Sequence, residues 1–206
     1  RVQALFGFHT SADYVLSWGT FMDWFALRKK RTLVTAEQAL PDRDQVIHPG
    51  HPHTVFNRPL TPPYAPEESI IYLGLGCFWG AERRFWQQPG VTLTAVGYGG
   101  GHTRNATYED VCSGNTGHVE LVLVAYDPSL TSLTALLKTF WEAHDPTQGM
   151  RQGNDLGTQY RSAIYTTTDQ QLQDALASRD AYQSILNSGG FGNITTEIEP
   201  HSNFYF

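Results

Sequence analysis

Residues 69–86 read SIIYLGLGCFWGAERRFW, an apolar run that gives way to a helical pattern after a glycine. The run from Ile70 to Leu75 is short and bounded by a glycine, which is typical of a buried strand. The segment from Cys77 to Gln88 is rich in helix formers and is followed by a Pro-Gly stop signal. We therefore expect a strand that ends at Gly76 and a helix that opens at Cys77.

The rest of the chain after this stretch repeats the same alternation. Strands are expected at Val91–Tyr98, His118–Tyr126 and Ser162–Tyr165, and helices at Leu133–Trp141 and Asp169–Leu186. The order strand, helix, strand thus occurs twice in succession. Two such units side by side predict an α/β (α+β) fold, a ferredoxin-like two-layer sandwich with a mixed sheet, an extra helix and short terminal strands.

Residues 1–68 differ from the remainder in composition. Six prolines fall between residues 49 and 66, and an aromatic segment with a run of basic residues precedes them. We expect an irregular N-terminal arm over residues 1–68, with a short helix near Phe21, Trp24 and Phe25. Residues 69–206 are expected to form one folded domain.

Three histidines of the arm, His48, His51 and His53, lie close together in the sequence. A shared metal ion is one interpretation, because imidazole is a common metal ligand. No cysteine or carboxylate stands directly beside them, and prolines surround them. Ordinary loop histidines are the favoured interpretation, so no metal and no cofactor is expected.

Composition excludes several classes of function. The 206 residues include 14 basic and 20 acidic side chains, a formal charge of −6, with no basic stripe that would bind a phosphate backbone. Two cysteines are too few for a disulfide framework and favour a reducing compartment. No stretch of 18 apolar residues is present. We expect a soluble, cytoplasmic monomer with no nucleic-acid partner and no membrane span.

The position of Cys77 favours a reactive thiol. A sulfur at the start of a helix lies near unpaired N–H groups and the positive end of the helix dipole, which stabilise a thiolate. A small buried hydrophobic residue is the alternative for the same position. Nearby glycines at Gly74, Gly76 and Gly80 also suggest a dinucleotide-binding loop and a nicotinamide oxidoreductase. That motif requires a glycine where Trp79 stands, so the match fails.

Several ordered motifs resemble those of the A-type peptide methionine sulfoxide reductases. They are Gly76-Cys77-Phe78-Trp79-Gly80 with Ala81-Glu82, Gly97-Tyr98, Thr107 to Gly114, Thr116 to Glu120, Trp141 to Asp145 and Gln148 to Tyr165. The similarity covers about Ser69 to Phe206. It implies thiol-dependent reduction of methionine S-sulfoxide, free or in oxidised proteins, to methionine. A non-catalytic module that recognises oxidised methionine is the alternative that uses the same pocket.

The resemblance also implies roles for individual residues. Cys77 matches the nucleophile, which is left as a sulfenic acid. Glu120 matches the acid, and desolvation on its strand should raise the pKa of its carboxyl group, unless the strand exposes it. Tyr108 and Tyr160 match the two tyrosines whose hydroxyl groups bind the sulfoxide oxygen.

Three further positions match the substrate pocket of that family. Phe78 and Trp79 match the apolar wall around the methyl group of the substrate. Asp155 matches an aspartate that organises polar contacts, although a turn at residues 154–155 explains it equally well.

Regeneration of the thiol is where the sequence departs from the common pattern of the family. Most relatives continue past the segment that matches Asn203 to Phe206 into a tail with resolving cysteines, so we expect such a tail to be missing here. Cys112 is the other thiol of this sequence. Thioredoxin is the expected final reductant, with an external thiol such as glutathione or glutaredoxin as the alternative.

Overall fold

The computed structural model describes residues 31–206. The short helix expected near Phe21, Trp24 and Phe25 therefore lies outside the described residues. Within the described part, the apolar run forms strand β1, which pairs antiparallel with β3 on one side and with β6 on the other. The strands of this sheet are β1 (Ser69–Leu75), β2 (Val91–Gly99), β3 (Val119–Tyr126), β6 (Ser162–Thr166), β7 (Glu197–Pro200) and β8 (Phe204–Tyr205).

The six strands lie in the order β7-β6-β1-β3-β2-β8. The pair β6 and β7 is parallel, and the other neighbours are antiparallel, so the sheet is mixed as expected. Two further strands, β4 (Arg151–Gln152) and β5 (Asp155–Leu156), form a separate small hairpin.

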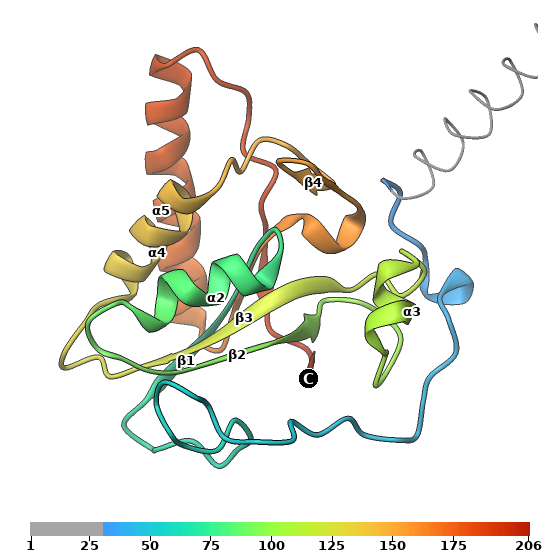
Figure 1. Ribbon diagram of the computed structural model, residues 1–206. Coiled ribbons are helices and arrows are strands. Elements are labelled where there is room, and N and C mark those ends of the chain that lie inside the picture. The colour runs from blue at the N-terminus through green and yellow to red at the C-terminus, as the bar shows by residue number, and fades with distance from the viewer. Residues whose placement is uncertain (1–30) are drawn as a thin grey trace, which may run out of the picture.

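Helices cover one face of the sheet. The α-helices are α2 (Phe78–Trp86), α3 (Tyr108–Cys112), α4 (Leu133–Ala143) and α5 (Asp169–Ser188), and the 3-10 helices are η1 (Ala36–Gln38) and η2 (Thr158–Tyr160). In Figure 1, α2, α4 and α5 lie together on one side of the sheet, whereas α3 lies at the far end of the strands. Side chains cap three of these α-helices: Thr107 accepts from Asp110 N at the start of α3, Ser132 from Ala135 N at α4, and Thr168 from Gln171 N at α5.

The opposite face of the sheet is covered by the proline-rich segment and by C-terminal residues rather than by helices. Phe56, Leu60 and Tyr64 from the proline-rich segment pack there, together with Phe204 and Phe206 from the C-terminal end. As a result all eight residues of β3 are buried. Within residues 31–68, η1 is the one helix or strand before β1, and the proline-rich part of this segment packs against the hydrophobic core.

His53 is one of the buried residues of this segment. Its Nε2 lies 2.9 Å from Thr94 Oγ1, and its Nδ1 accepts hydrogen bonds from the amides of Val55 and Phe56 at 3.0 and 3.2 Å. Both ring nitrogens are therefore engaged within the protein. Among residues 31–206 no group of three or more histidine, cysteine or acidic side chains converges as a metal site, so the structure gives the metal interpretation of His48, His51 and His53 no support.

No helix within residues 31–206 combines the length and the apolar character needed to cross a membrane.

Gly97 marks the closest approach between β2 and the C-terminal end of the chain. A Cβ atom at this position would overlap the carbonyl oxygen of Tyr205 and lie 2.6 Å from Cζ of Phe204. Only glycine therefore lets β8 lie beside β2 and close that edge of the sheet.

Gly97→Ala is expected to lower the free energy of unfolding by about 1–3 kcal/mol, because the added methyl group overpacks the contact with β8. Chemical denaturation measures this value. Gly50→Ala is the matched control, since a Cβ there meets nothing within 4 Å, and it should change the free energy by less than about 0.5 kcal/mol. Equal effects of the two variants would show that the close contact has no energetic role.

Candidate functional site

A glycine turn places Cys77 between β1 and α2. Gly76 adopts a positive φ of 92°, and a Cβ there would lie 2.8 Å from Cβ of Gln152. A residue with a side chain would be strained on both counts. Cys77 is the N-cap residue of α2, and its side chain is exposed. The helix thus begins one residue later than expected, and the buried-hydrophobe alternative for Cys77 is wrong.

The side chain of Cys77 does not cap α2. Instead, the amide of Phe78 donates a 3.0 Å hydrogen bond to Oε2 of Glu120, a residue of β3. Side chains on a strand alternate between its two faces, and Val122 and Val124 belong to the core on the helix side of the sheet. Glu120 continues that row toward α2, which is why its carboxyl group reaches the first turn of the helix.

Burial controls the protonation of Glu120. The residue is 3% exposed, so the alternative of an exposed strand carboxylate is wrong. Desolvation raises the pKa of Glu120 to about 7, the hydrogen bond from Phe78 N opposes this increase, and the charge of Asp155 adds to it. Burial outweighs the single amide donor, so this carboxyl group carries a proton on a large fraction of molecules near neutral pH.

Two predicted tyrosines lie within electrostatic reach of the Glu120 carboxyl group. Tyr160 lies in η2, and burial raises its pKa to about 12, with the charge of Glu120 as the next cause. Tyr108 is the first residue of α3 and is 51% exposed. The neighbouring Cys112 thiol is the main cause that raises the pKa of Tyr108, and the charges of Glu120 and Cys77 contribute. Both phenols therefore stay protonated and can donate hydrogen bonds near Glu120.

The predicted apolar wall is split between a buried and an exposed ring. Phe78 is buried, and its ring centroid lies 5.5 Å from that of Tyr98. Trp79 is 70% exposed beside Cys77. Tyr98, directly opposite Glu120 in the β2–β3 pairing, was not predicted as a site residue. Burial and the charge of Glu120 raise the pKa of Tyr98, so it is a neutral phenol next to the acid.

Asp155 and Cys112 lie at the margin of the site. Asp155 is an exposed residue of β5, paired with Gln152 of β4, so it lies in a strand rather than in the turn itself. Its charge contributes to the raised pKa of Glu120. Cys112 ends α3 and is half-buried, and Cys77 and Cys112 are both free thiols in this structure.

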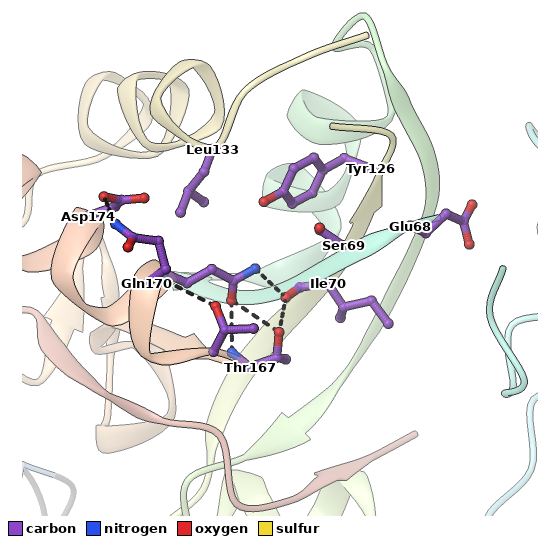
Figure 2. Close-up of a pocket in the computed structure, with 10 residues that line it drawn as sticks. Glu68, Ser69, Ile70, Tyr126, Leu133, Thr167, Gln170 and Asp174 are labelled. Carbon is purple, nitrogen blue, oxygen red and sulfur yellow. Dashed lines mark hydrogen bonds between the residues drawn. The ribbon is translucent and has the colours of Figure 1, made fainter. Parts of the chain in front are cut away.

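A cavity of about 390 Å³ lies at the opposite end of β1 (Figure 2). Its lining includes Ser69 and Ile70, the first residues of β1, whereas Cys77 follows the last one. Gln171 donates to Ile70 O at 3.0 Å and accepts from Thr167 N at 2.8 Å. These polar groups are bonded to one another, so the cavity is not part of the candidate site.

The topology also argues against the dinucleotide-binding alternative. A dinucleotide-binding unit begins with a parallel strand pair whose glycine loop follows the first strand. Here β1, which precedes Gly76 and Cys77, is antiparallel to both of its neighbours. The glycines around Cys77 serve the turn into α2 instead.

Comparisons with known proteins show the family of this chain. The family model described as peptide methionine sulfoxide reductase matches residues 69–206. The chain is 58% identical over 181 residues to the peptide methionine sulfoxide reductase MsrA of Agrobacterium fabrum, covering 87% of this chain and 84% of that protein. Its structure is similar to methionine sulfoxide reductase A of Corynebacterium diphtheriae, with a TM-score of 0.80 and 44% identity over 85% of each chain.

A more distant neighbour is Mxr1 from Saccharomyces cerevisiae, solved in complex with Trx2. It has a TM-score of 0.53 and 27% identity, and the match covers 71% of this chain and 86% of that one. The family match spans the segment that contains Cys77, Glu120, Tyr108 and Tyr160. This chain belongs to the peptide methionine sulfoxide reductase family.

Proposed function

We propose that this protein reduces methionine S-sulfoxide, free or within oxidised proteins, to methionine by means of the Cys77 thiol. The hydrogen bond between Phe78 N and Glu120 is the observation that carries the proposal. It brings a carboxyl group that is protonated near neutral pH to the residue next to an exposed cysteine at a helix N-terminus. A nucleophile and an acid side by side are what sulfoxide reduction requires.

The first half-reaction follows from this arrangement. The Cys77 thiolate attacks the sulfur of the sulfoxide, and Glu120 donates its proton to the sulfoxide oxygen. The attack forms a bond between the two sulfur atoms, and the protonated oxygen then moves from the substrate sulfur to the Cys77 sulfur. An oxygen–Sγ bond forms as the substrate sulfur–oxygen bond and the sulfur–sulfur bond break, so methionine leaves and Cys77 is left as a sulfenic acid. Cysteine is oxidised by two electrons and the substrate sulfur is reduced by two.

The surrounding side chains hold the substrate. Tyr108 and Tyr160 donate hydrogen bonds to the sulfoxide oxygen, a role supported by phenols that stay protonated beside Glu120. Phe78 and Trp79 contact the methyl group with their aromatic faces. Asp155 orders the polar side of the pocket and helps to keep Glu120 protonated.

A second thiol is needed to return Cys77 to its reduced form. It condenses with the sulfenic acid of Cys77 to give a disulfide and water, and a thioredoxin then reduces that disulfide. The solved complex of the neighbour Mxr1 with Trx2 supports this choice of reductant. The two free thiols support a reducing compartment such as the cytoplasm.

We propose further that residues 69–206 are the catalytic domain and that residues 1–68 extend it. The range of the family match supports this boundary. The name ferredoxin-like for the central fold is supported by the strand order β6-β1-β3-β2, with α2 joining β1 to β2 and α4 lying between β3 and β6 in the chain.

Cys77→Ser is expected to abolish methionine release from methionine S-sulfoxide, because serine cannot form the sulfenic acid. Cys112→Ser is the matched control and should still release about one methionine per protein molecule in a single turnover. Mass spectrometry of released methionine, with dithiothreitol as reductant for multiple turnovers, measures both. Turnover that persists in Cys77→Ser would remove the proposed function.

The single-turnover rate of the wild-type protein is expected to fall as pH rises through about 7, because Glu120 then loses the proton that it donates. Glu120→Gln should lower this rate roughly 10²–10⁴-fold and remove that fall. Substrate affinity should change little, since glutamine keeps the shape and an acceptor for Phe78 N. An unchanged rate or an unchanged pH profile would count against Glu120 as the acid.

A further inference from the structure

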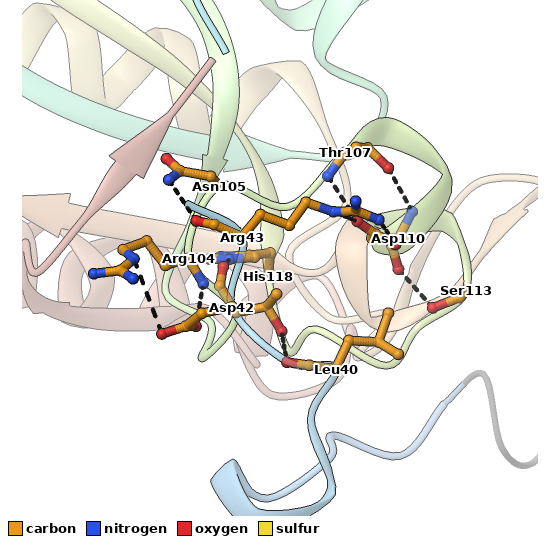
Figure 3. Close-up of polar contacts among 10 residues, drawn as sticks. Leu40, Asp42, Arg43, Arg104, Asn105, Thr107, Asp110, Ser113 and His118 are labelled. Carbon is orange, nitrogen blue, oxygen red and sulfur yellow. Dashed lines mark hydrogen bonds and ion pairs between the residues drawn. The ribbon is translucent and has the colours of Figure 1, made fainter. Parts of the chain in front are cut away.

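A short piece of the N-terminal segment is bonded to the loop that leads into α3. We name residues 40–44 the strap. Figure 3 shows it beside residues 103–110. Its contacts are Leu40 N to Asn115 O (2.9 Å), Thr103 Oγ1 to Leu40 O (2.8 Å), Arg43 N to Arg104 O (3.0 Å), Asn105 Nδ2 to Arg43 O (2.8 Å) and Arg104 N to Asp42 Oδ1 (2.8 Å). The strap therefore follows the backbone of this loop closely.

One side chain of the strap reaches α3 itself. Nε of Arg43 donates to Oδ2 of Asp110 at 2.7 Å, and Nη2 donates to Oδ1 at 3.1 Å. This is a two-bond ion pair, the geometry in which an arginine fixes the orientation of a carboxylate. Arg43 is the main cause that lowers the pKa of Asp110 to about 2, so the pair stays charged at neutral pH.

The same carboxylate also starts α3. Oδ2 of Asp110 accepts from Thr107 N at 3.0 Å, and Thr107 Oγ1 accepts from Asp110 N at 3.3 Å, which completes a capping box. Arg43, which lies outside the helix, thus holds the aspartate of this capping box in place.

A helix as short as α3 depends on such contacts. It has five residues, from Tyr108 to Cys112, and an isolated helix of this length is unstable in water. Its first residue, Tyr108, is half-exposed, so core packing does little to hold the ring. The position of the hydroxyl group depends mainly on where the backbone of the first turn lies.

We propose that Arg43 is a positioning residue for sulfoxide reduction, because its ion pair with Asp110 holds the first turn of α3 and thereby the Tyr108 hydroxyl group at the site of Cys77. This inference rests on the proposed function, in which that hydroxyl binds the sulfoxide oxygen. Arg104 offers the matched comparison. Its guanidinium group lies 3.3 Å from Asp44 and 4.0 Å from Asp42. Both are residues of the strap, so Arg104 pairs with the strap rather than with Asp110.

The test measures single-turnover methionine release and its dependence on methionine S-sulfoxide concentration. Arg43→Ala should lower the maximal rate about fivefold, the factor that corresponds to the loss of one exposed ion pair. Arg43→Lys should restore part of it, and Arg104→Ala should leave it unchanged. In a Tyr108→Phe background, Arg43→Ala should have no further effect, because both changes remove the same hydrogen bond.

A merely structural role for Arg43 gives a different pattern. Equal slowing by Arg43→Ala and Arg104→Ala, multiplicative effects of Arg43→Ala and Tyr108→Phe, or a rate unaffected by Arg43→Ala would each overturn the proposal.

Hydrogen exchange separates this inference from the proposed function. The amides of residues 108–113 should exchange about fivefold faster in Arg43→Ala than in Arg104→Ala, whether or not the protein reduces sulfoxides. Unchanged exchange would overturn the inference. Absence of methionine release from the wild-type protein would overturn the proposed function instead.

Discussion

The hydrogen bond from the Phe78 amide to Glu120 joins the start of the helix that carries the nucleophile to the strand that carries the acid. The amide belongs to the first turn of α2, next to Cys77. The carboxyl group belongs to the buried strand β3, which pairs with β1 in the sheet. The bond replaces the side-chain cap that Cys77 does not supply. It therefore fixes the nucleophile and the acid relative to each other through a single contact.

Two opposing effects set the proton affinity of Glu120. A helix N-terminus and an amide donor favour the carboxylate, whereas removal from water favours the neutral acid. Desolvation is larger here, and the pKa rises to about 7. Glu120 lies in the row of β3 that faces the helices, together with Val122 and Val124, so the packing of the helices on this face keeps water from its carboxyl group.

Much of this arrangement could be predicted from the sequence because its signals are local. An apolar run, a glycine and a helical pattern place Cys77 at a helix start, and the boundaries of β1, β2, β3, α4, β6 and α5 agree with the expected ones to within three residues. The exposure of Glu120 could not be settled by alternation, because β3 is buried on both faces. Phe78 is buried and Trp79 is exposed although the two residues are adjacent. Successive side chains of a helix point about 100° apart, so one can face the core while the next faces solvent.

No local signal in the sequence predicts the contacts of the strap. Arg43 and Asp110 are 67 residues apart in the sequence, and the short segment 40–44 has no periodicity that predicts its partners. Tyr98 belongs to one of the motifs that carry the resemblance, but it had no assigned role in the site, since a tyrosine in a strand is ordinarily a core residue. Its position opposite Glu120 emerges only from the pairing of β2 with β3.

The protonation of Glu120 is the most direct test of this account. Carbon-13 NMR of protein labelled at glutamate side-chain carboxyl carbons, with Glu120→Gln to assign the signal, follows that single group across pH. The account predicts a transition near pH 7 for the wild-type protein. A transition near the ordinary value of 4.5 would mean that Glu120 is already ionised at neutral pH and holds no proton for the sulfoxide oxygen.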